Sequence, residues 1–227
     1  MELTGGIHWV DGVRGANCYL VLGAEGLYLV DTGMPNNALR VLRYLKSLDR
    51  AAKDLRMILL THSDIDHAGS AAELRRKTGA KIAIHEADAP VVSGQAEGKK
   101  VKGALGALFR VMSKLMRIEK FQADVMLKDG EKVGPVTVIA TPGHTQGSVC
   151  FLHEGSQTLL AGDALRTNRG GDVVTSPQVM NFDNSRTWES AERISTLSFE
   201  ALLPGHGQPL LQSAADQVRR LVQTKSA

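Results

Sequence analysis

The stretch Thr61-His62-Ser63-Asp64-Ile65-Asp66-His67 places two imidazoles and two carboxylates within six positions of the chain. It directly follows the apolar run Met57 to Leu60, which is typical of a buried β-strand. Ionised side chains at the end of a buried strand lose water, and like charges repel each other there. A divalent cation removes this conflict. The stretch therefore predicts a metal site, and the alternative is a solvated loop whose acids and histidines gather by chance.

Three further candidate ligands stand beside glycine, and each follows an apolar, strand-like run. Glycine lets the backbone turn sharply and approach an ion. Alone, each candidate would be interpreted as a turn with a surface side chain. Together with the first cluster they make four strand ends with the same kinds of side chain, which favours one shared site. The candidates are His144 after Val136 to Ala140, Asp163 after Thr158 to Ala161, and His206 after Ala201 to Leu203.

The order of these groups resembles the metallo-β-lactamase superfamily, whose signature is His-x-His-x-Asp-His followed by a lone His, a lone Asp and a final His. The resemblance extends over nearly the full chain. It implies an α/β fold, namely a four-layer αβ/βα sandwich in which two packed sheets have helices outside. The supporting motifs are Val30-Asp31-Thr32-Gly33, Leu60-Thr61-His62, Thr141-Pro142-Gly143-His144-Thr145-Gln146-Gly147-Ser148, Gly162-Asp163 and Pro204-Gly205-His206-Gly207.

The resemblance also implies two metal sites that share one carboxylate. Asp31 is expected to support these sites from beneath without being a ligand. The remaining histidines, His8, His85 and His153, have no acid or histidine cluster around them, so we interpret them as structural or surface residues. The implied ligands are His62, Asp64 and His144 for site one, Asp66, His67 and His206 for site two, and Asp163 as the bridge.

Asp64 departs from the family pattern, because the family has its second histidine at this position. Aspartate is shorter than histidine, so it reaches a metal only if the backbone sits closer or a water intervenes. A third carboxylate would make the centre a weaker Lewis acid. It also shifts preference from zinc toward iron or manganese, and the related flavodiiron proteins carry a Glu here and hold iron. We expect two divalent ions, zinc first with iron or manganese as alternatives, while the occupancy of site one stays open.

The resemblance implies a metal-dependent hydrolase in which a metal-bound hydroxide cleaves an ester, a lactone or a related acyl bond. Asp66 is the predicted catalytic residue, which would orient the water and pass a proton to the leaving group. The enzyme is expected to be binuclear, or mononuclear if Asp64 leaves site one empty. Two alternatives remain: an iron-bound redox or oxygen-handling enzyme related to flavodiiron proteins, and a non-catalytic metal-binding sensor module.

The 227 residues suffice for one α/β domain, and the absence of a linker or repeat predicts a single domain over residues 1–227. The start of the chain lacks the basic and apolar stretches of a secretion signal, and no apolar run is long enough to span a bilayer. We therefore expect a cytoplasmic protein. Cys18 and Cys150 lie far apart in apolar segments, which favours buried, inert thiols.

The segment from Lys99 to Lys120 holds seven basic residues and one acid, with apolar residues at helical spacing between Gly103 and Ile118. We expect a helical cap insertion over about residues 93–127, whose Leu and Met side chains line an apolar pocket. A core helix or a dimer contact are the alternatives, so a homodimer stays open. The expected partner is a small molecule with an apolar acyl part. Nucleic acid is not expected, since the aromatic content of 4% disfavours base stacking.

Overall fold

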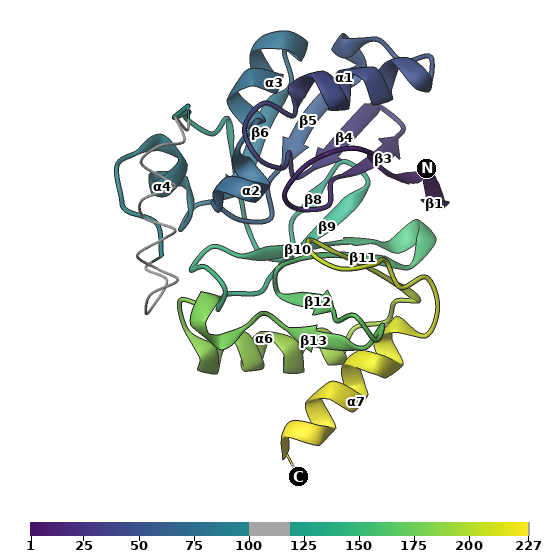
Figure 1. Ribbon diagram of the computed structural model, residues 1–227, viewed down its shortest axis with the longest axis vertical. Coiled ribbons are helices and arrows are strands. Elements are labelled where there is room, and N and C mark those ends of the chain that lie inside the picture. The colour runs from purple at the N-terminus through teal and green to yellow at the C-terminus, as the bar shows by residue number, and fades with distance from the viewer. Residues whose placement is uncertain (100–118, 227) are drawn as a thin grey trace.

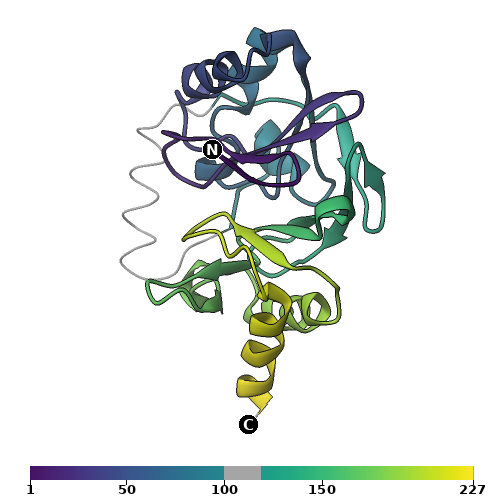
Figure 2. The same ribbon diagram turned by 90° about the vertical axis from the view of Figure 1, so that its right-hand side faces the viewer.

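The computed structural model describes residues 1–99 and 119–226. Two β-sheets lie face to face, and helices cover the outer side of each sheet (Figure 1). In the turned view α1 and α3 lie at one end of the molecule and α6 and α7 at the other (Figure 2). This arrangement is the four-layer α/β sandwich that the family resemblance implies.

The first sheet has seven strands in sequence order, antiparallel from β1 to β4 and parallel from β4 to β7. Parallel strands need crossover connections, and helices supply them outside the sheet. The elements of this half are β1 (Glu2–Thr4), β2 (Ile7–Trp9), β3 (Tyr19–Gly23), β4 (Gly26–Val30), α1 (Ala38–Ser47), η1 (Ala52–Asp54), β5 (Leu55–Leu59), α2 (Ile65–Ala68), α3 (Ala71–Thr78), β6 (Lys81–His85), α4 (Ala89–Ser93) and β7 (Val125–Leu127).

The second sheet has five strands in the order β14-β11-β10-β9-β8, and β12 and β13 form a separate two-stranded sheet. Only the β11–β14 pair in the second sheet is parallel. The elements of this half are β8 (Lys132–Val133), β9 (Val136–Ala140), β10 (Val149–His153), η2 (Glu154–Ser156), β11 (Thr158–Gly162), β12 (Leu165–Thr167), β13 (Val173–Thr175), η3 (Gln178–Met180), α6 (Asn184–Ser195), β14 (Ala201–Pro204) and α7 (Ala214–Ser226).

The core has three layers because both faces of each sheet are covered. Side chains alternate along a strand: Leu29 on β4 packs toward α1 and α3, whereas Tyr28 and Val30 pack between the sheets. On β11, Leu160 packs between the sheets and Leu159 packs toward α6 and α7. These strands are therefore apolar on both faces, which explains why the sequence shows them as continuous apolar runs.

Residues 100–118 of the expected cap lie outside the described residues. Within the rest of the expected range 93–127, Val125–Leu127 form β7, which pairs with β6 at the edge of the first sheet. Leu127 is buried between the two sheets. The last three residues of the expected range therefore belong to the first sheet and not to a cap. Burial of Leu127 in the core favours a strand at this place.

No helix in the described part of the chain is long and apolar enough to cross a bilayer. The cytoplasmic location expected from the sequence stays a prediction. Cys18 and Cys150 are free and buried, as expected. Burial raises the pKa of Cys150 to about 12 and that of Cys18 well above its usual value, so neither is a reactive thiolate at neutral pH.

Candidate metal centre

The candidate ligands lie where strands of both sheets end. His62 and Asp64 follow β5, and Asp66 and His67 belong to the short helix α2. The second sheet supplies the other three, from the β9–β10 loop and from the ends of β11 and β14. Strand ends fix the position of these side chains, because the preceding backbone is held by the sheets. All seven predicted ligands therefore meet at one edge of the sandwich.

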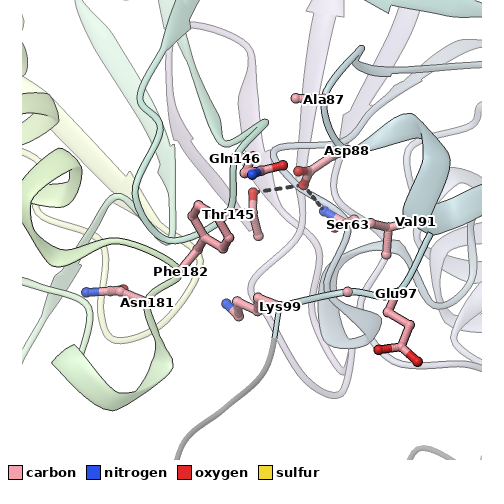
Figure 3. A pocket seen from close by; sticks show the side chains of 11 residues that line it. Ser63, Ala87, Asp88, Val91, Glu97, Lys99, Thr145, Gln146, Asn181 and Phe182 are labelled. Carbon is pink, nitrogen blue, oxygen red and sulfur yellow. Dashed lines mark hydrogen bonds between the residues drawn. The ribbon is translucent and has the colours of Figure 1, made fainter.

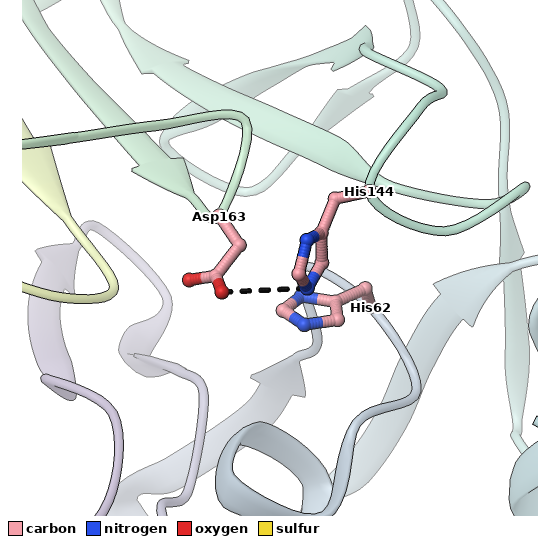
Figure 4. Close-up of side chains that lie close together, drawn as sticks. All are labelled: His62, His144 and Asp163. Carbon is pink, nitrogen blue, oxygen red and sulfur yellow. Dashed lines mark ion pairs between the residues drawn. The ribbon is translucent and has the colours of Figure 1, made fainter. Parts of the chain in front are cut away.

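Site one is formed by His62, His144 and Asp163, whose ligand atoms all lie within 4.8 Å of one another. The three side chains point toward a common centre (Figure 4). Asp64 Oδ2 lies 3.1 Å from His144 Nε2 and 3.5 Å from His62 Nε2. The Asp64 carboxylate therefore lies close enough to both histidines to share a metal ion with them, although its side chain is shorter than that of histidine.

Site two is formed by Asp66, His67 and His206, and their ligand atoms also lie within 4.8 Å of one another. His206 Nε2 is 3.2 Å from Asp66 Oδ2 and 3.4 Å from His67 Nε2. The turn after β14 comes so close that a Cβ on Gly205 would stand 2.6 Å from both Asp163 Oδ1 and His67 Cε1. Glycine at position 205 is therefore a requirement of the packed site.

Asp163 lies between the two sites. Its Oδ2 is 3.4 Å from His144 Nε2 in site one. Its Oδ1 is 3.3 Å from His67 Nε2 and 3.6 Å from His206 Nε2 in site two. One carboxylate thus offers one oxygen to each side, which is the geometry that a bridging ligand needs.

Two imidazoles are oriented by hydrogen bonds on the side away from the site. Asp31 Oδ2 lies 2.8 Å from His67 Nδ1, the contact from beneath that the sequence predicts. Thr61 Oγ1 donates to Asp31 Oδ2 at 2.8 Å, so the hydroxyl oxygen of Thr61 accepts from His62 Nδ1 at 3.0 Å. In the neutral imidazole these contacts place the proton on Nδ1, so that Nε2 is the ring nitrogen that faces the site and can bind a metal. Asp31 holds a left-handed backbone, φ 59°, which is costly for a residue with a side chain and is common at functional sites.

Asn181, which the sequence did not single out, orients the third imidazole. Its Oδ1 lies 3.2 Å from His144 Nδ1. The Asn181 amide nitrogen donates to Asn184 Oδ1 at 2.9 Å and to Ser176 O at 3.3 Å, which fixes Oδ1 as the atom that faces the histidine. His144 therefore donates from Nδ1 and directs its Nε2 lone pair into site one.

The donor set fits divalent metal ions. Among the described residues, two buried side-chain atoms lack a hydrogen-bond partner, and both belong to the candidate ligands: His62 Nε2 and Asp163 Oδ1. Buried polar atoms are almost always satisfied, so such a pair needs an explanation. Nitrogen lone pairs and carboxylate oxygens converging on two centres are the ligands that zinc and iron take in proteins.

At the centre, burial and neighbouring charges shift the pKa values of the candidate ligands in opposite directions. Burial alone would raise the pKa of Asp163, but the surrounding histidines, His67 first, hold it well below its usual value. Burial would lower the pKa of His67, yet the carboxylates of Asp31 and Asp163 raise it well above the usual value. A metal at site two must therefore displace a proton from His67, and metal affinity at this site falls as the pH is lowered.

Asp88 is a second residue that the sequence did not single out. It is 2% exposed, and its carboxylate accepts hydrogen bonds from Ser63 N, Thr145 Oγ1 and Gly147 N, each at 2.8 Å. Ser63 lies between His62 and Asp64, and Thr145 follows His144. One carboxylate therefore joins the loop that carries His62 and Asp64 to the loop that carries His144.

A pocket of about 500 Å³ lies beside site one. Its wall includes Ser63, Lys99 and Asn181, which are neighbours of site-one residues in sequence or in space. Val91 and Phe182 add apolar surface (Figure 3). The volume is in the range of small-molecule sites, and the lining residues include direct neighbours of the candidate ligands in the sequence, Ser63 and Thr145.

The histidines interpreted as structural lie in other contacts. His8 Nδ1 is 3.2 Å from the hydroxyl of Tyr44. His85 Nδ1 accepts from Ala87 N at 3.2 Å, and His153 Nδ1 accepts from Ser156 N at 3.1 Å at the start of η2. None of the three belongs to the two ligand groups found among the described residues.

The profile of the metallo-beta-lactamase superfamily matches residues 11–206, a span that contains all seven candidate ligands. The chain belongs to this superfamily. It is thus a member of an enzyme family of metallo-hydrolases. Its relatives include YobT of Bacillus subtilis, with 31% identity over 91% of this chain and 89% of that protein, and the probable metallo-hydrolase YflN of the same organism, with 28% identity over 92% and 86%. The acyl-coenzyme A thioesterase MBLAC2 of Homo sapiens is 26% identical over 90% and 79%.

Solved structures show the same fold. A metallo-beta-lactamase family protein from Thermus thermophilus superimposes with a TM-score of 0.73 at 23% identity, covering 97% of this chain and 79% of that chain. The protein TTHA1623, solved in a di-iron-bound form, gives a TM-score of 0.69 at 25% identity, covering 89% and 93%. The predicted family and fold class are therefore confirmed.

Proposed function

We propose that this protein is a metal-dependent hydrolase that cleaves a small acyl ester, lactone or thioester. The observation that carries the proposal is the pair of neighbouring ligand groups with Asp163 between them, beside a pocket. The proposed ligands are the seven residues that the sequence predicts, with His62, Asp64 and His144 at site one and Asp66, His67 and His206 at site two. A divalent metal bound there lowers the pKa of water and polarises a carbonyl oxygen.

Asp66 is the proposed proton carrier. The side chains of Asp66 and His206 are 31% and 30% exposed, whereas those of His62, His67 and His144 are at most 2% exposed. Site two thus has a carboxylate that a substrate can reach. The pKa of Asp66 is lowered, against the effect of burial, by the hydrogen bond to His206. Asp66 is therefore ionised at neutral pH, accepts a proton from the attacking water and returns it to the leaving oxygen or sulfur.

The pocket suggests where the substrate lies. Val91 and Phe182 offer apolar surface for an acyl chain, and Ser63 and Gln146 add polar groups to the same wall. The thioesterase named among the relatives acts on an acyl group that is joined to coenzyme A, as its name states. We propose that an acyl part of modest length packs against Val91 and Phe182, so that its carbonyl stands at the metal centre.

Zinc is the metal we propose first, with iron as the alternative. Four histidines and three carboxylates form the proposed set, and three carboxylates make the site more oxygen-rich than the family signature. The di-iron form of TTHA1623 shows that a structure of this fold holds iron. An iron centre would also leave the redox function open as the second candidate. A colourless metallated protein with esterase activity would contradict that candidate.

The test combines metal analysis with a substrate panel. Protein purified without added chelator is expected to contain at least one transition metal per chain and to hydrolyse aryl esters, lactones or acyl-coenzyme A thioesters. His206→Ala should lose both metal and activity, whereas His153→Ala, a histidine outside the site, should keep both. Hydrolysis by the metal-free protein at an undiminished rate would overturn the proposal.

A further inference from the structure

Lys99 reaches into site one from the wall of the pocket. Its ammonium nitrogen lies 2.6 Å from Asp64 Oδ2 and is also in contact with His144 Nε2. The Lys99 side chain is only 6% exposed. Lysine is rarely buried unless its charge is paired, so the carboxylate at position 64 explains why this ammonium is stable there.

The contact with His144 conflicts with metal binding. His144 donates its Nδ1 proton to Asn181, so Nε2 has a single lone pair for the site. A zinc ion on this nitrogen would stand about 2.0 to 2.1 Å from it. Since one lone pair accepts one partner, the ammonium and a metal at His144 exclude each other in this arrangement.

Lys99 and a metal ion would also compete for the carboxylate of Asp64. Asp64 Oδ2 contacts the ammonium of Lys99 and the Nε2 atoms of both histidines of site one. The carboxylate is therefore already paired with a cation of the protein itself. At site two, by contrast, no lysine or arginine is paired with Asp66 or Asp163 among the ion pairs of the described residues.

We propose that the ammonium of Lys99 occupies site one, where it pairs with Asp64 and contacts His144. Because of these contacts, it weakens the binding of a second metal ion there. The protein then holds one metal tightly at Asp66, His67 and His206, and a second only when Lys99 swings away. This inference rests on the proposed metallohydrolase function, but it concerns the number of metals and not the reaction.

The test is a Co²⁺ titration of the metal-free protein, followed by visible absorption and checked by metal analysis after gel filtration. The natural protein should bind one equivalent tightly and the second at least tenfold more weakly than the first. Lys99→Met should bind the second equivalent at least tenfold more tightly than the natural protein does. Lys99→Arg keeps the positive charge and should leave the second equivalent weak.

Lys128→Met is the matched control, because Lys128 is an exposed lysine that follows β7 and is replaced by the same side chain. It should titrate as the natural protein does. The circular dichroism and melting temperature of each metal-free variant show that it is folded. If Lys99→Met does not fold, Lys99→Gln replaces it, since it keeps a polar end without the charge.

Two equally tight equivalents in the natural protein would overturn the inference, and so would a second affinity that is unchanged in Lys99→Met. Neither result would contradict the proposed hydrolase function. If the natural protein binds no metal at all, or if His206→Ala keeps the first equivalent, the proposed function itself fails. The titration therefore separates the two failures.

Discussion

Sites one and two share Asp163 and the same strand-end placement, but they differ in what neutralises their carboxylates. Asp66 in site two lies beside His67 and His206 and is partly exposed to solvent. Asp64 in site one faces two histidines and the ammonium of Lys99. An aspartate at position 64, where the family signature has histidine, thus changes more than one ligand, because this partly buried carboxylate pairs with a cation of the chain itself.

The largest expected effect is the loss of the metal at site two. His67→Ala removes an imidazole that is fully buried and held by Asp31, so the variant should lose the tightly bound metal and all hydrolytic activity. Its melting temperature should also fall below that of the metallated protein, because metal binding energy adds to stability. Metal analysis and a thermal melt measure both. If His67→Ala retained its metal while His144→Ala lost it, the roles of the two sites would be reversed.

The next effect concerns the proton carrier of site two. Asp66→Asn is expected to lower kcat by about 10² to 10⁴, the range for a general acid–base group. Asp66 is also a proposed ligand, so metal content must be measured on the same sample. Asp64→Asn is the matched change in site one and should affect kcat less at equal metal content. A fully metallated and fully active Asp66→Asn enzyme would rule out the proposed role.

A smaller effect is expected beneath site two. Asp31→Asn removes one of the charged oxygens that accept from Thr61 N, Thr61 Oγ1 and His67 Nδ1. Changes to groups that orient a metal-bound histidine lower metal affinity by about 10- to 100-fold. Asp129→Asn is the control, because Asp129 accepts from Ala140 N and Arg193 away from the ligands. Equal metal affinities in the two variants would show that Asp31 does not orient His67.

The smallest effect is a gain at site one. Asp64→His restores the family pattern and removes the carboxylate that pairs with Lys99. We expect its second Co²⁺ equivalent to bind about tenfold more tightly, which corresponds to about 1.4 kcal/mol. The affinity of the first equivalent should stay the same. A titration in which neither affinity changes would mean that Asp64 does not act at site one.

The fold class was predicted through the resemblance of the sequence motifs to a known family, and the same motifs singled out the candidate ligands, whose role as ligands stays a prediction. Each ligand follows an apolar run or stands beside a glycine, and such local patterns are visible in one segment at a time. The three core layers explain why several strands are continuous apolar runs, since both faces of each sheet are covered. The short helix α2, which carries Asp66 and His67, was not expected, because four residues are too few to show a helical period.

Only the tertiary structure decided which partners these residues meet. Asp88 lies 57 residues from Thr145, and Asn181 lies 37 residues from His144, yet each fixes a loop or a ring of site one. Lys99 belonged to a basic segment in the sequence, and nothing local connected it with Asp64. The physical reason is that a lone polar residue has no periodic signature, and its role comes from burial beside an opposite charge or an unsatisfied hydrogen-bonding group. That burial exists only once the two sheets are packed together.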